Sequence, residues 1–371
     1  MSFPNTLRTA RAIVVGLLAL GLLATSAEAS APTGPRLATI ELIETKGSER
    51  AEPTAPPFVA LTTFGPSGEK QRHLLKQRLE VGPELAPSPV FGPSWSGDGG
   101  MIAFVGLKGK TSGIYVVDAD GGHPHLVKGT RDGRDPVISP DGMTVAFSRW
   151  RTRFPKPTLK PWKQGNGYSS TTTWIVNLDG GKAQRLTSWR NGLDYVPESF
   201  SPDGSLLAMT KRDDRVNGPR IVLMRMDGGE LTELEAPGEE AAISPDGRQI
   251  AFAGYLDPTR IEAEEDHDYD IGELYTMNVD GSQVRRLTYN SDKIESSPSW
   301  DPSGQRLAYA ETKADTGFLG ALALLFPTGN AIVEINADAS CRKTVRSSEK
   351  VALYGAAWQP GAARGVGRIA C

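Results

Sequence analysis

ISPDGRQIAF at residues 243–252 recurs as ISPDGMTVAF at 138–147 and as FSPDGSLLAM at 200–209. Looser copies, WSGDGGMIAF and WDPSGQRLAY, occupy 95–104 and 300–309. In each copy a short apolar run is followed by a turn and a second apolar run. Proline presets φ for such a turn, aspartate bonds its own backbone two residues on, and glycine takes the positive φ. The repeat therefore predicts a chain of β-hairpins.

A second pair of apolar runs follows each hairpin. LYTMNVDGS at 274–282 leads to RLT at 286–288, and IYVVDADGG at 114–122 leads to the pair at 126–127. Each unit is thus expected to hold four strands, with Asp-Gly hairpins between the first and second strands and between the third and fourth. A four-stranded unit cannot bury both of its faces alone, so such units stack around an axis.

The spacing of the turns gives the architecture. The turn aspartates Asp98, Asp141, Asp203 and Asp246 follow one another at 43, 62 and 43 residues, about the period of a propeller blade with one insertion. Their recurrence favours a structural turn role over a catalytic one. We predict an all-β fold, a six-bladed β-propeller of four-stranded blades, with clear repeats over 93–345.

The two ends of the chain are predicted to share one blade. Residues 356–361 resemble a lone first strand, and 38–43 resemble a second strand. Residues 58–62 and 72–75 would then be the third and fourth strands, so the last blade is closed by strands from both termini. Residues 76–92, which are rich in proline, are expected to connect this blade to the next.

The N-terminus has the pattern of a secretory signal peptide over residues 1–29. Arg8 and Arg11 precede an apolar run at 12–24, and Ala27-Glu28-Ala29 provides a cleavage site before Ser30. We therefore expect an exported protein, periplasmic or secreted, with one propeller domain at 30–371 and no transmembrane anchor after cleavage. Removing the leader moves the formal charge from −3 to −4, which argues against nucleic acid as a partner.

The two cysteines, Cys341 and Cys371, lie late in the chain. In an exported protein such a pair is more often a disulfide than two free thiols, and a bridge would fasten the C-terminal tail to the fifth blade. The alternative is two unpaired, partly buried thiols.

Three insertions between second and third strands are expected on one face of the propeller, because strand direction alternates in every blade. One is basic with interleaved aromatics, one at 262–270 is acidic, and one at 318–326 is apolar. We predict a partner-binding face here, since arginine and tryptophan are common interface anchors. The alternative is that these loops vary in length and are solvated. The predicted contact residues are Arg149, Trp150, Arg151, Arg153, Trp162, Phe318, Leu322 and Phe326.

Catalytic and metal signals are weak. Asp266, Asp268 and Asp270 alternate as in a calcium loop, but Gly272 comes one residue late and Met277 stands where the closing glutamate belongs. No Gly-x-Ser-x-Gly elbow is present, and His123 and His125 follow an outer hairpin turn. We name no catalytic residue, expect no cofactor, and keep the aspartates only as a weak calcium candidate.

The unit Ser-Pro-Asp-Gly-x-x-Ile-Ala-Phe, then Ile-Tyr-x-x-Asn-x-Asp-Gly, then Arg-Leu-Thr resembles the WD40-like PD40 repeat of TolB-like six-bladed propellers. Residues 244–252 with 274–288 are the nearest copy, and the resemblance covers about 93–309. The family includes a periplasmic Tol–Pal component that binds a lipoprotein and is not an enzyme, propellers that precede peptidase domains, and lyases of acidic sugars. About 35 residues separate the cleavage site from the first propeller-like strands, too few for the small α/β domain that TolB carries there, so the resemblance is to the family and not to TolB itself.

Taken with this resemblance, the sequence favours an exported, non-catalytic propeller that acts as a protein-interaction module in the cell envelope or outside the cell. Its partner would be another exported or envelope protein, and we expect a monomer. The alternative is a secreted carbohydrate-active enzyme or carbohydrate-binding propeller that uses the central channel.

Overall fold

The computed structural model describes a set of ranges that all lie within the unit Gly34–Cys371. They are 36–43, 58–66, 68–78, 86–87, 92–109, 111–153, 168–190, 192–216, 218–254, 272–289, 293–313, 331–348, 351–361 and 368–371. Every regular element in these ranges is a β-strand. No helix in the described part of the chain is long and apolar enough to cross a membrane. The predicted leader at 1–29 lies outside the described residues.

The strands form five hydrogen-bonded sheets. One sheet has the order β24 (Val351–Trp358), β1 (Leu37–Ile43), β2 (Phe58–Phe64), β3 (Arg72–Arg78). The next contains β4 (Ala86–Pro87), β5 (Ser94–Trp95), β6 (Met101–Lys108), β7 (Thr111–Asp118) and β8 (His125–Leu126). A third has β9 (Gly133–Ile138), β10 (Thr144–Arg153), β11 (Tyr168–Asn177) and β12 (Gln184–Arg185).

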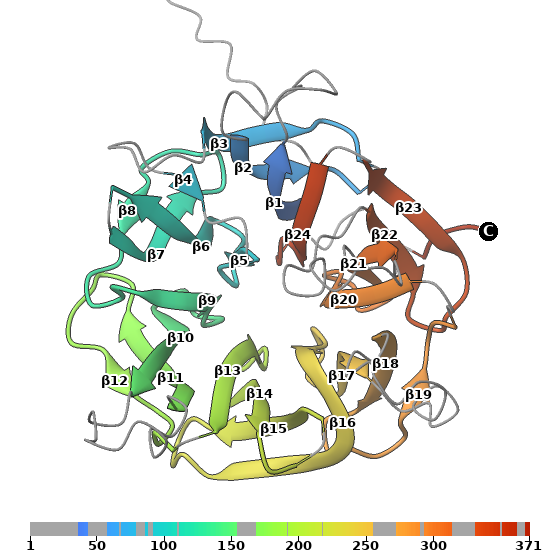
Figure 1. The fold of residues 1–371 in the computed structure, drawn as a ribbon. Helices are drawn as coiled ribbons and strands as arrows, with labels where there is room; N and C mark the ends of the chain where they lie inside the picture. Colours follow the sequence, from blue (N-terminus) through green and yellow to red (C-terminus); the bar gives the residue numbers. More distant parts are fainter. Residues whose placement is uncertain are drawn as a thin grey trace, which may run out of the picture. The chain divides into compact units, whose positions relative to one another are not determined.

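The other two sheets complete the ring. A seven-stranded sheet runs β13 (Leu193–Phe200), β14 (Leu206–Asp213), β15 (Arg220–Arg225), β16 (Leu231–Ile243), β17 (Gln249–Gly254), β18 (Glu273–Asn278), β19 (Arg285–Arg286). The last sheet has β20 (Lys293–Trp300), β21 (Arg306–Lys313), β22 (Ala331–Asn336) and β23 (Arg342–Ser347). Figure 1 shows the sheets set radially, with β5, β9, β13, β20 and β24 nearest the centre. This is a propeller arrangement, as the repeats predict.

The ring closes where the repeats predict it. β24 pairs antiparallel with β1, with Leu37 opposite Trp358, and β1 continues the sheet through β2 to β3. Strands from the two ends of the described chain therefore lie in one sheet (Figure 1).

Two details differ from the expected repeat. Residues 76–92 are more than a connector, because Ala86–Pro87 pairs with Gly106 and Leu107 of β6. β16 is continuous, whereas the repeat predicts separate strands for the end of one unit and the start of the next. Its pairing changes from β15 at Pro237 to β17 at Gly238, so Pro-Gly bends the strand between the two halves of the sheet without a loop.

The recurring turn is held by the side chains that the motif repeats. Ser139 Oγ donates to Asp141 Oδ1 at 2.5 Å, and Asp141 Oδ1 also accepts from the Met143 amide at 3.0 Å. Gly142 has φ of +69°, which closes the turn at no steric cost. Serine donates to the turn aspartate in the same way at Asp98, Asp203 and Asp246. These hydrogen bonds lower the aspartate pKa, at Asp203 to about 2.

The core consists of apolar layers between neighbouring sheets. The residue that ends each apolar run after the turn is fully buried: Phe104, Phe147, Met209, Phe252 and Tyr309. Phe252, for example, packs with Ile221 and Leu223 of the preceding half-sheet. Burying one such side chain contributes about 1.5–3 kcal/mol. Periodic burial of this kind is what holds the four-stranded units together.

Neighbouring inner strands are joined by two kinds of hydrogen bond, which we call intersheet latches. In one kind a serine Oγ accepts a hydrogen bond from a backbone amide of the next inner strand. The pairs are Ser94 with Ile138, Ser199 with Ile243, and Ser299 with Trp358, at 3.0–3.2 Å. In the other kind alanine occupies the serine position, and a tryptophan indole donates to its carbonyl: Trp95 to Ala357 and Trp300 to Ala242, both at 3.0 Å. The two latches therefore differ at the residue just before the motif, which is serine in the first kind and alanine in the second.

Replacing Trp300 by phenylalanine is expected to lower the free energy of unfolding by about 1–2 kcal/mol, because the Ala242 carbonyl loses its donor inside the wall. Urea unfolding of the mature protein measures the change. Trp150→Phe is the matched control, since Trp150 is 54 % exposed. Equal losses in both variants would contradict a role for the latch.

Candidate functional site

A cavity of about 810 Å³ lies among the innermost strands. Its wall is made by β5, β9, β13, the second half of β16, β20 and β24, with the starts of the turns that follow them. Figure 1 shows these strands around the centre of the ring. Four sheets thus supply one inner strand each and the seven-stranded sheet supplies two, β13 and β16, while Trp150 of β10 and Arg212 of β14 add side chains to the same wall.

β-Bulges shape this wall. The pairing of β9, β13, β16, β20 and β24 with its neighbour is interrupted near the middle of the strand. At these interruptions Asp135, Glu240, Ser297 and Gly355 have φ between +49° and +68°. A positive φ is unfavourable for residues other than glycine, so these backbones are held by their surroundings. A bulge also redirects a side chain that regular alternation would turn elsewhere.

Three carboxylates on the cavity wall come from these irregular positions. We call Asp135, Glu198 and Glu240 the channel acidic cluster; all three line the cavity and are half-buried. Ser148 Oγ donates to Asp135 Oδ2 at 2.5 Å, and Thr210 Oγ1 donates to Glu198 Oε1 at 2.7 Å.

Glu240 is held from two neighbouring strands. Its own amide donates to Thr210 Oγ1 at 3.1 Å, and its Oε2 accepts from the Ser297 amide at 2.5 Å. Thr210 therefore links Glu198 to Glu240, while Ser297 comes from the next sheet. The carboxylates are fixed in place before any ligand arrives.

Arg212 is a cation that acts on this cluster. It lines the cavity and forms an ion pair with Glu239. Burial disfavours its charge, but the neighbouring carboxylates of Glu239, Glu198 and Glu240 raise the Arg212 pKa. The Arg212 guanidinium thus interacts electrostatically with several carboxylates.

The acids of the cluster have raised pKa values. Burial, and then the charge of Glu240, raise the pKa of Glu198 well above its ordinary value. Burial and the charge of Glu239 raise the pKa of Glu240 to about 7, against the opposing effects of the Ser297 amide and Arg212. Burial also raises the pKa of Asp135. Groups perturbed in this way by burial and by each other are typical of functional sites.

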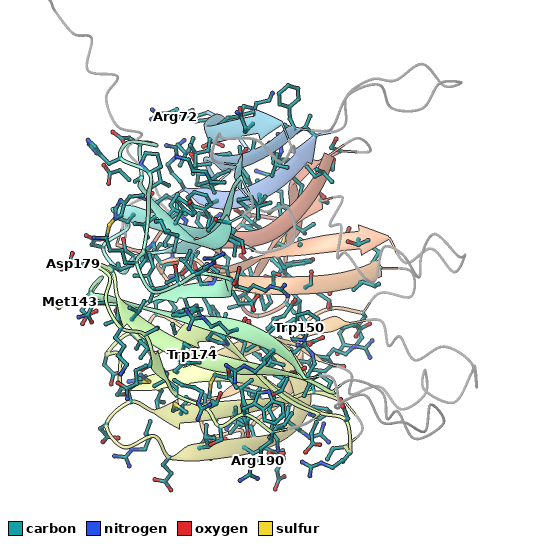
Figure 2. All side chains as sticks on the ribbon, turned by 60° about the vertical axis from the view of Figure 1, so that its left-hand side comes forward. Arg72, Met143, Trp150, Trp174, Asp179 and Arg190 are labelled. Atoms are coloured by element: carbon teal, nitrogen blue, oxygen red, sulfur yellow. A yellow bond between two sulfur atoms is a disulfide. The ribbon has the colours of Figure 1, made fainter. Side chains whose placement is uncertain are left out.

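The predicted partner-binding residues are divided by strand alternation. Trp150 lines the cavity, and the Arg134 guanidinium lies 5.7 Å from the centre of its ring. Arg149 faces the other side of β10, where it lies over Phe147 and Trp174 and donates to the Gly129 carbonyl. Figure 2 places Trp150 away from Met143 and Asp179, which mark the hairpin face. Trp150 is therefore available to a ligand, while Arg149 is engaged within its sheet.

The remaining predicted site residues are only partly described. Arg151 is exposed at the end of β10, and Arg153 ends that strand. Trp162, Phe318, Leu322, Phe326 and the weak calcium candidate Asp266, Asp268 and Asp270 lie outside the described residues. Among the residues described, no group of three or more histidine, cysteine or acidic side chains is placed to hold a metal ion.

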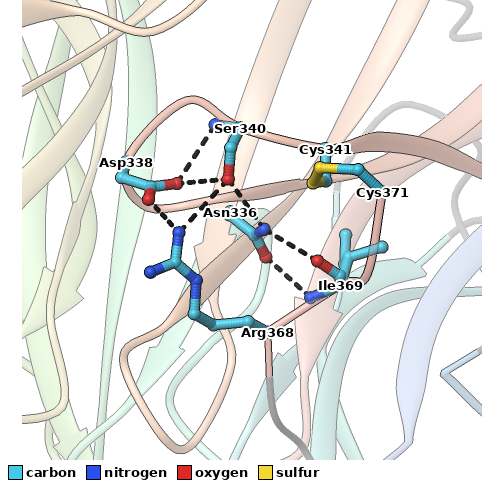
Figure 3. The surroundings of a disulfide bond; sticks show 7 residues. All are labelled: Asn336, Asp338, Ser340, Cys341, Arg368, Ile369 and Cys371. Atoms are coloured by element: carbon cyan, nitrogen blue, oxygen red, sulfur yellow. Dashed lines mark hydrogen bonds and ion pairs between the residues drawn. A yellow bond between two sulfur atoms is a disulfide. The ribbon is translucent and has the colours of Figure 1, made fainter.

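The C-terminal tail is fastened to the loop after β22. Cys341 and Cys371 form a disulfide with Cα atoms 5.0 Å apart. Beside it, the Asn336 side chain donates to the Ile369 carbonyl at 3.0 Å and accepts from the Ile369 amide at 2.8 Å, and Arg368 pairs with Asp338 (Figure 3).

The channel acidic cluster was missed by motif reasoning, although a signal for it exists. Asp135 and Glu240 each lie six residues before a turn aspartate, and Glu198 lies five before Asp203. Acidic residues are rare at buried positions, so an acid five or six residues before the turn aspartate stands out in an inner strand. Aligning the repeats on their turns and looking for charge upstream would find all three.

The fold and the shared wall define the class of protein: a β-propeller with a polar central cavity. Residues 84–257 match the family described as PD40, the TolB beta propeller domain. TolB of the Tol-Pal system from Francisella tularensis (strain WY96-3418) is 25 % identical over 232 residues, which are 61 % of this chain and 46 % of that protein.

Solved structures agree on the fold. TolB from Acinetobacter baumannii has a TM-score of 0.60 and 21 % identity over 88 % of this chain and 67 % of that one. A putative TolB from Agrobacterium tumefaciens has a TM-score of 0.55 and 18 % identity over 86 % and 97 %. The matches support a TolB-like β-propeller, and they do not identify the chain as TolB itself. It spans about half the length of the F. tularensis TolB that it matches.

Proposed function

We propose that this protein is an exported, non-catalytic six-bladed propeller that acts as a protein-interaction module in the cell envelope or outside the cell. The match of residues 84–257 to the TolB propeller domain carries the proposal, because the curated relative is described as a Tol-Pal system protein. The count of six treats the two halves of the seven-stranded sheet, which meet in β16, as two blades. Export rests on the leader pattern of residues 1–29.

We place the partner surface at the central cavity. Trp150 is 54 % exposed there, and an exposed tryptophan is a strong candidate anchor. Another predicted anchor on β10, Arg149, lies over the Phe147 and Trp174 rings and donates to the Gly129 carbonyl. The proposal therefore narrows the predicted binding face to the side that Trp150 lines.

Affinity capture from the native envelope and secreted fractions tests this function, with mature 30–371 as bait. We expect Trp150→Ala to retain at least five-fold less of the captured partner than the wild type. Met143→Ala should retain as much as the wild type, since Met143 is 67 % exposed on the hairpin face. The native protein recovered from these fractions should begin at Ser30. Capture of no exported protein, or equal capture by both variants, would argue against the module.

A carbohydrate-active or carbohydrate-binding propeller is the second candidate. Glu198 and Glu240 are neighbouring acids with raised pKa values, as a general acid and base require, and Trp150 offers a ring on which a sugar could stack. Saturable binding or cleavage of a polysaccharide, lost in Glu240→Gln, would favour this candidate over the interaction module.

A further inference from the structure

The C-terminal tail shows how one outer turn of the propeller holds a peptide segment. In the turn after β22, the Asn336 side chain donates to the Ile369 carbonyl at 3.0 Å and accepts from the Ile369 amide at 2.8 Å. Arg368 forms an ion pair with Asp338 and donates to Ser340 Oγ at 3.2 Å (Figure 3). An asparagine, an aspartate and a serine thus bind one arginine and the backbone of the residue that follows it.

The turn after β18 repeats this arrangement with the same three residue types. The corresponding pairs are Asn278 and Asn336, Asp280 and Asp338, and Ser282 and Ser340. The asparagine Nδ2 donates to the serine Oγ at 2.8 Å after β18 and at 3.0 Å after β22. The serine Oγ donates to the aspartate Oδ1 at 2.6 Å in both turns, and the serine amide donates to the same atom at 2.9 and 3.1 Å. The next residue has positive φ in both, +54° at Gln283 and +50° at Cys341. The two turns therefore present the same groups in the same conformation.

The groups that hold the tail after β22 are not used by the described part of the chain after β18. Asn278 is half-buried, and Asp280 and Ser282 are exposed. Asn278 Nδ2 spends one of its two hydrogens on Ser282, which leaves the other hydrogen and Oδ1 for a peptide backbone. Among the described residues Asp280 accepts hydrogen bonds only from Ser282, and these bonds lower the Asp280 pKa, so its carboxylate stays charged at neutral pH.

The outer turns of the other described units lack this set of side chains. After β7, Asp118 replaces the asparagine and pairs with His123. After β11, Gly181 replaces the serine. After β15, Arg225 replaces the asparagine and pairs with Asp227, the same contact of guanidinium and turn aspartate that the tail makes. The turn aspartate therefore accepts arginine readily, and the turn after β18 alone combines it with a free asparagine among these described turns.

We propose that the turn formed by Asn278, Asp280 and Ser282 is a docking site for an arginine-bearing segment of a protein partner. Asp280 pairs with the arginine, and Asn278 exchanges hydrogen bonds with the amide and carbonyl of the residue after it. The occupant is another protein rather than the tail of a second copy, because the Cys341–Cys371 disulfide already fastens that tail to its own blade. None of the three residues lines the central cavity, so this site goes beyond the proposed function there.

A peptide titration followed by NMR tests the inference on isotope-labelled mature protein with its disulfide intact. The probe is acetylated Gly-Val-Gly-Arg-Ile-Ala amide, the sequence of residues 365–370. We expect saturable shifts of the Asn278 side-chain NH₂ and of the backbone amides of 280–282. One matched probe replaces arginine by citrulline, and a second carries N-methylisoleucine, which removes the amide that Asn278 accepts. Each matched probe should bind about five-fold more weakly, since it loses one charged or backbone contact.

Variants of the protein locate the site. Asp280→Asn keeps an acceptor for the Ser282 hydrogen bonds and loses the charge, so it should weaken binding of the arginine peptide about five-fold. Asn278→Ala should weaken it similarly, and if that variant fails to fold, the two matched probes test the same contact on the wild type. Asp179→Asn, in the turn after β11, is the matched control and should leave binding unchanged, as should Trp150→Ala in the cavity.

Three results would overturn the inference: equal binding of the arginine and citrulline peptides, shifts at 336–340 in place of 278–282, or loss of binding in Trp150→Ala. Self-association of the wild type that Asp280→Asn abolishes would also overturn it, because the turn would then bind a second copy. Capture of an exported protein through Trp150 with no peptide binding would leave the interaction module and remove this site. Peptide binding that Asp280→Asn weakens, with no capture through Trp150, would do the reverse.

Discussion

The free energy of unfolding is expected to be about 2–3 kcal/mol lower at pH 8 than at pH 5 through Glu295 alone. Glu295 is fully buried in β20, and burial raises its pKa from 4.5 to about 7 although a hydrogen bond from Thr288 opposes the shift. Each pKa unit corresponds to about 1.4 kcal/mol, and the interval from pH 5 to 8 covers most of the difference. The stabilisation is complete below pH 4.5 and is lost as the pH rises through 7.

The neighbours of Glu295 explain why burial dominates. Arg342 lowers its pKa, but Arg342 also pairs with Glu311 and donates to the Tyr309 hydroxyl at 2.7 Å. Glu273, which raises the Glu295 pKa, is itself paired with Arg286. The cations of this region are therefore shared among several carboxylates, so they only partly offset the effect of burial on the Glu295 pKa.

Urea unfolding of the wild type and of Glu295→Gln at pH 5 and pH 8, at one ionic strength, measures the effect. Glutamine keeps the size of the side chain and cannot ionise, so its stability should change less with pH by about 2–3 kcal/mol. Glu230→Gln, an exposed position, should follow the wild type. The same pH dependence in all three proteins would show that Glu295 is ionised in the fold at neutral pH.

The turns and the ring closure could be predicted because they depend on local chemistry. The Ser-Pro-Asp-Gly turn specifies its own hydrogen bonds, as between Ser244 and Asp246, wherever it occurs. The looser copy shows why the pattern survives substitution: serine and aspartate exchange places, and Asp301 accepts from the amides of Gln305 and Arg306 while Ser303 donates to it. A period built from such turns determines where strands begin and end.

The candidate site could not be predicted by the same means, because it depends on bulges. Regular alternation assigns each residue of a strand to one face, and a bulge shifts that assignment by one. Asp135, Glu198 and Glu240 therefore reach the cavity only because the pairing of their strands is interrupted. Trp150 and Arg149 are neighbours in the sequence, yet the strand directs them to opposite sides. The three-dimensional structure is needed to show that Trp150 lines the cavity while Arg149 packs within its sheet.

Removing the disulfide is expected to lower the free energy of unfolding by about 3–4 kcal/mol. The bond joins Cys341 to Cys371, 30 residues apart in the sequence, and a cross-link of that span restricts the unfolded chain by about this amount. In the fold it also keeps Ile369 against Asn336 and Arg368 against Asp338 (Figure 3).

Urea unfolding of oxidised protein and of Cys341→Ala/Cys371→Ala compares the two states directly. Asp338→Asn with the disulfide intact is the control, and it should cost less than about 1 kcal/mol because the Arg368 pair is half exposed. An unchanged midpoint in the double variant would show that the bond contributes nothing to folding. The expected loss would instead mean that the protein depends on an oxidising compartment for its full stability, which is the condition that its proposed export would provide.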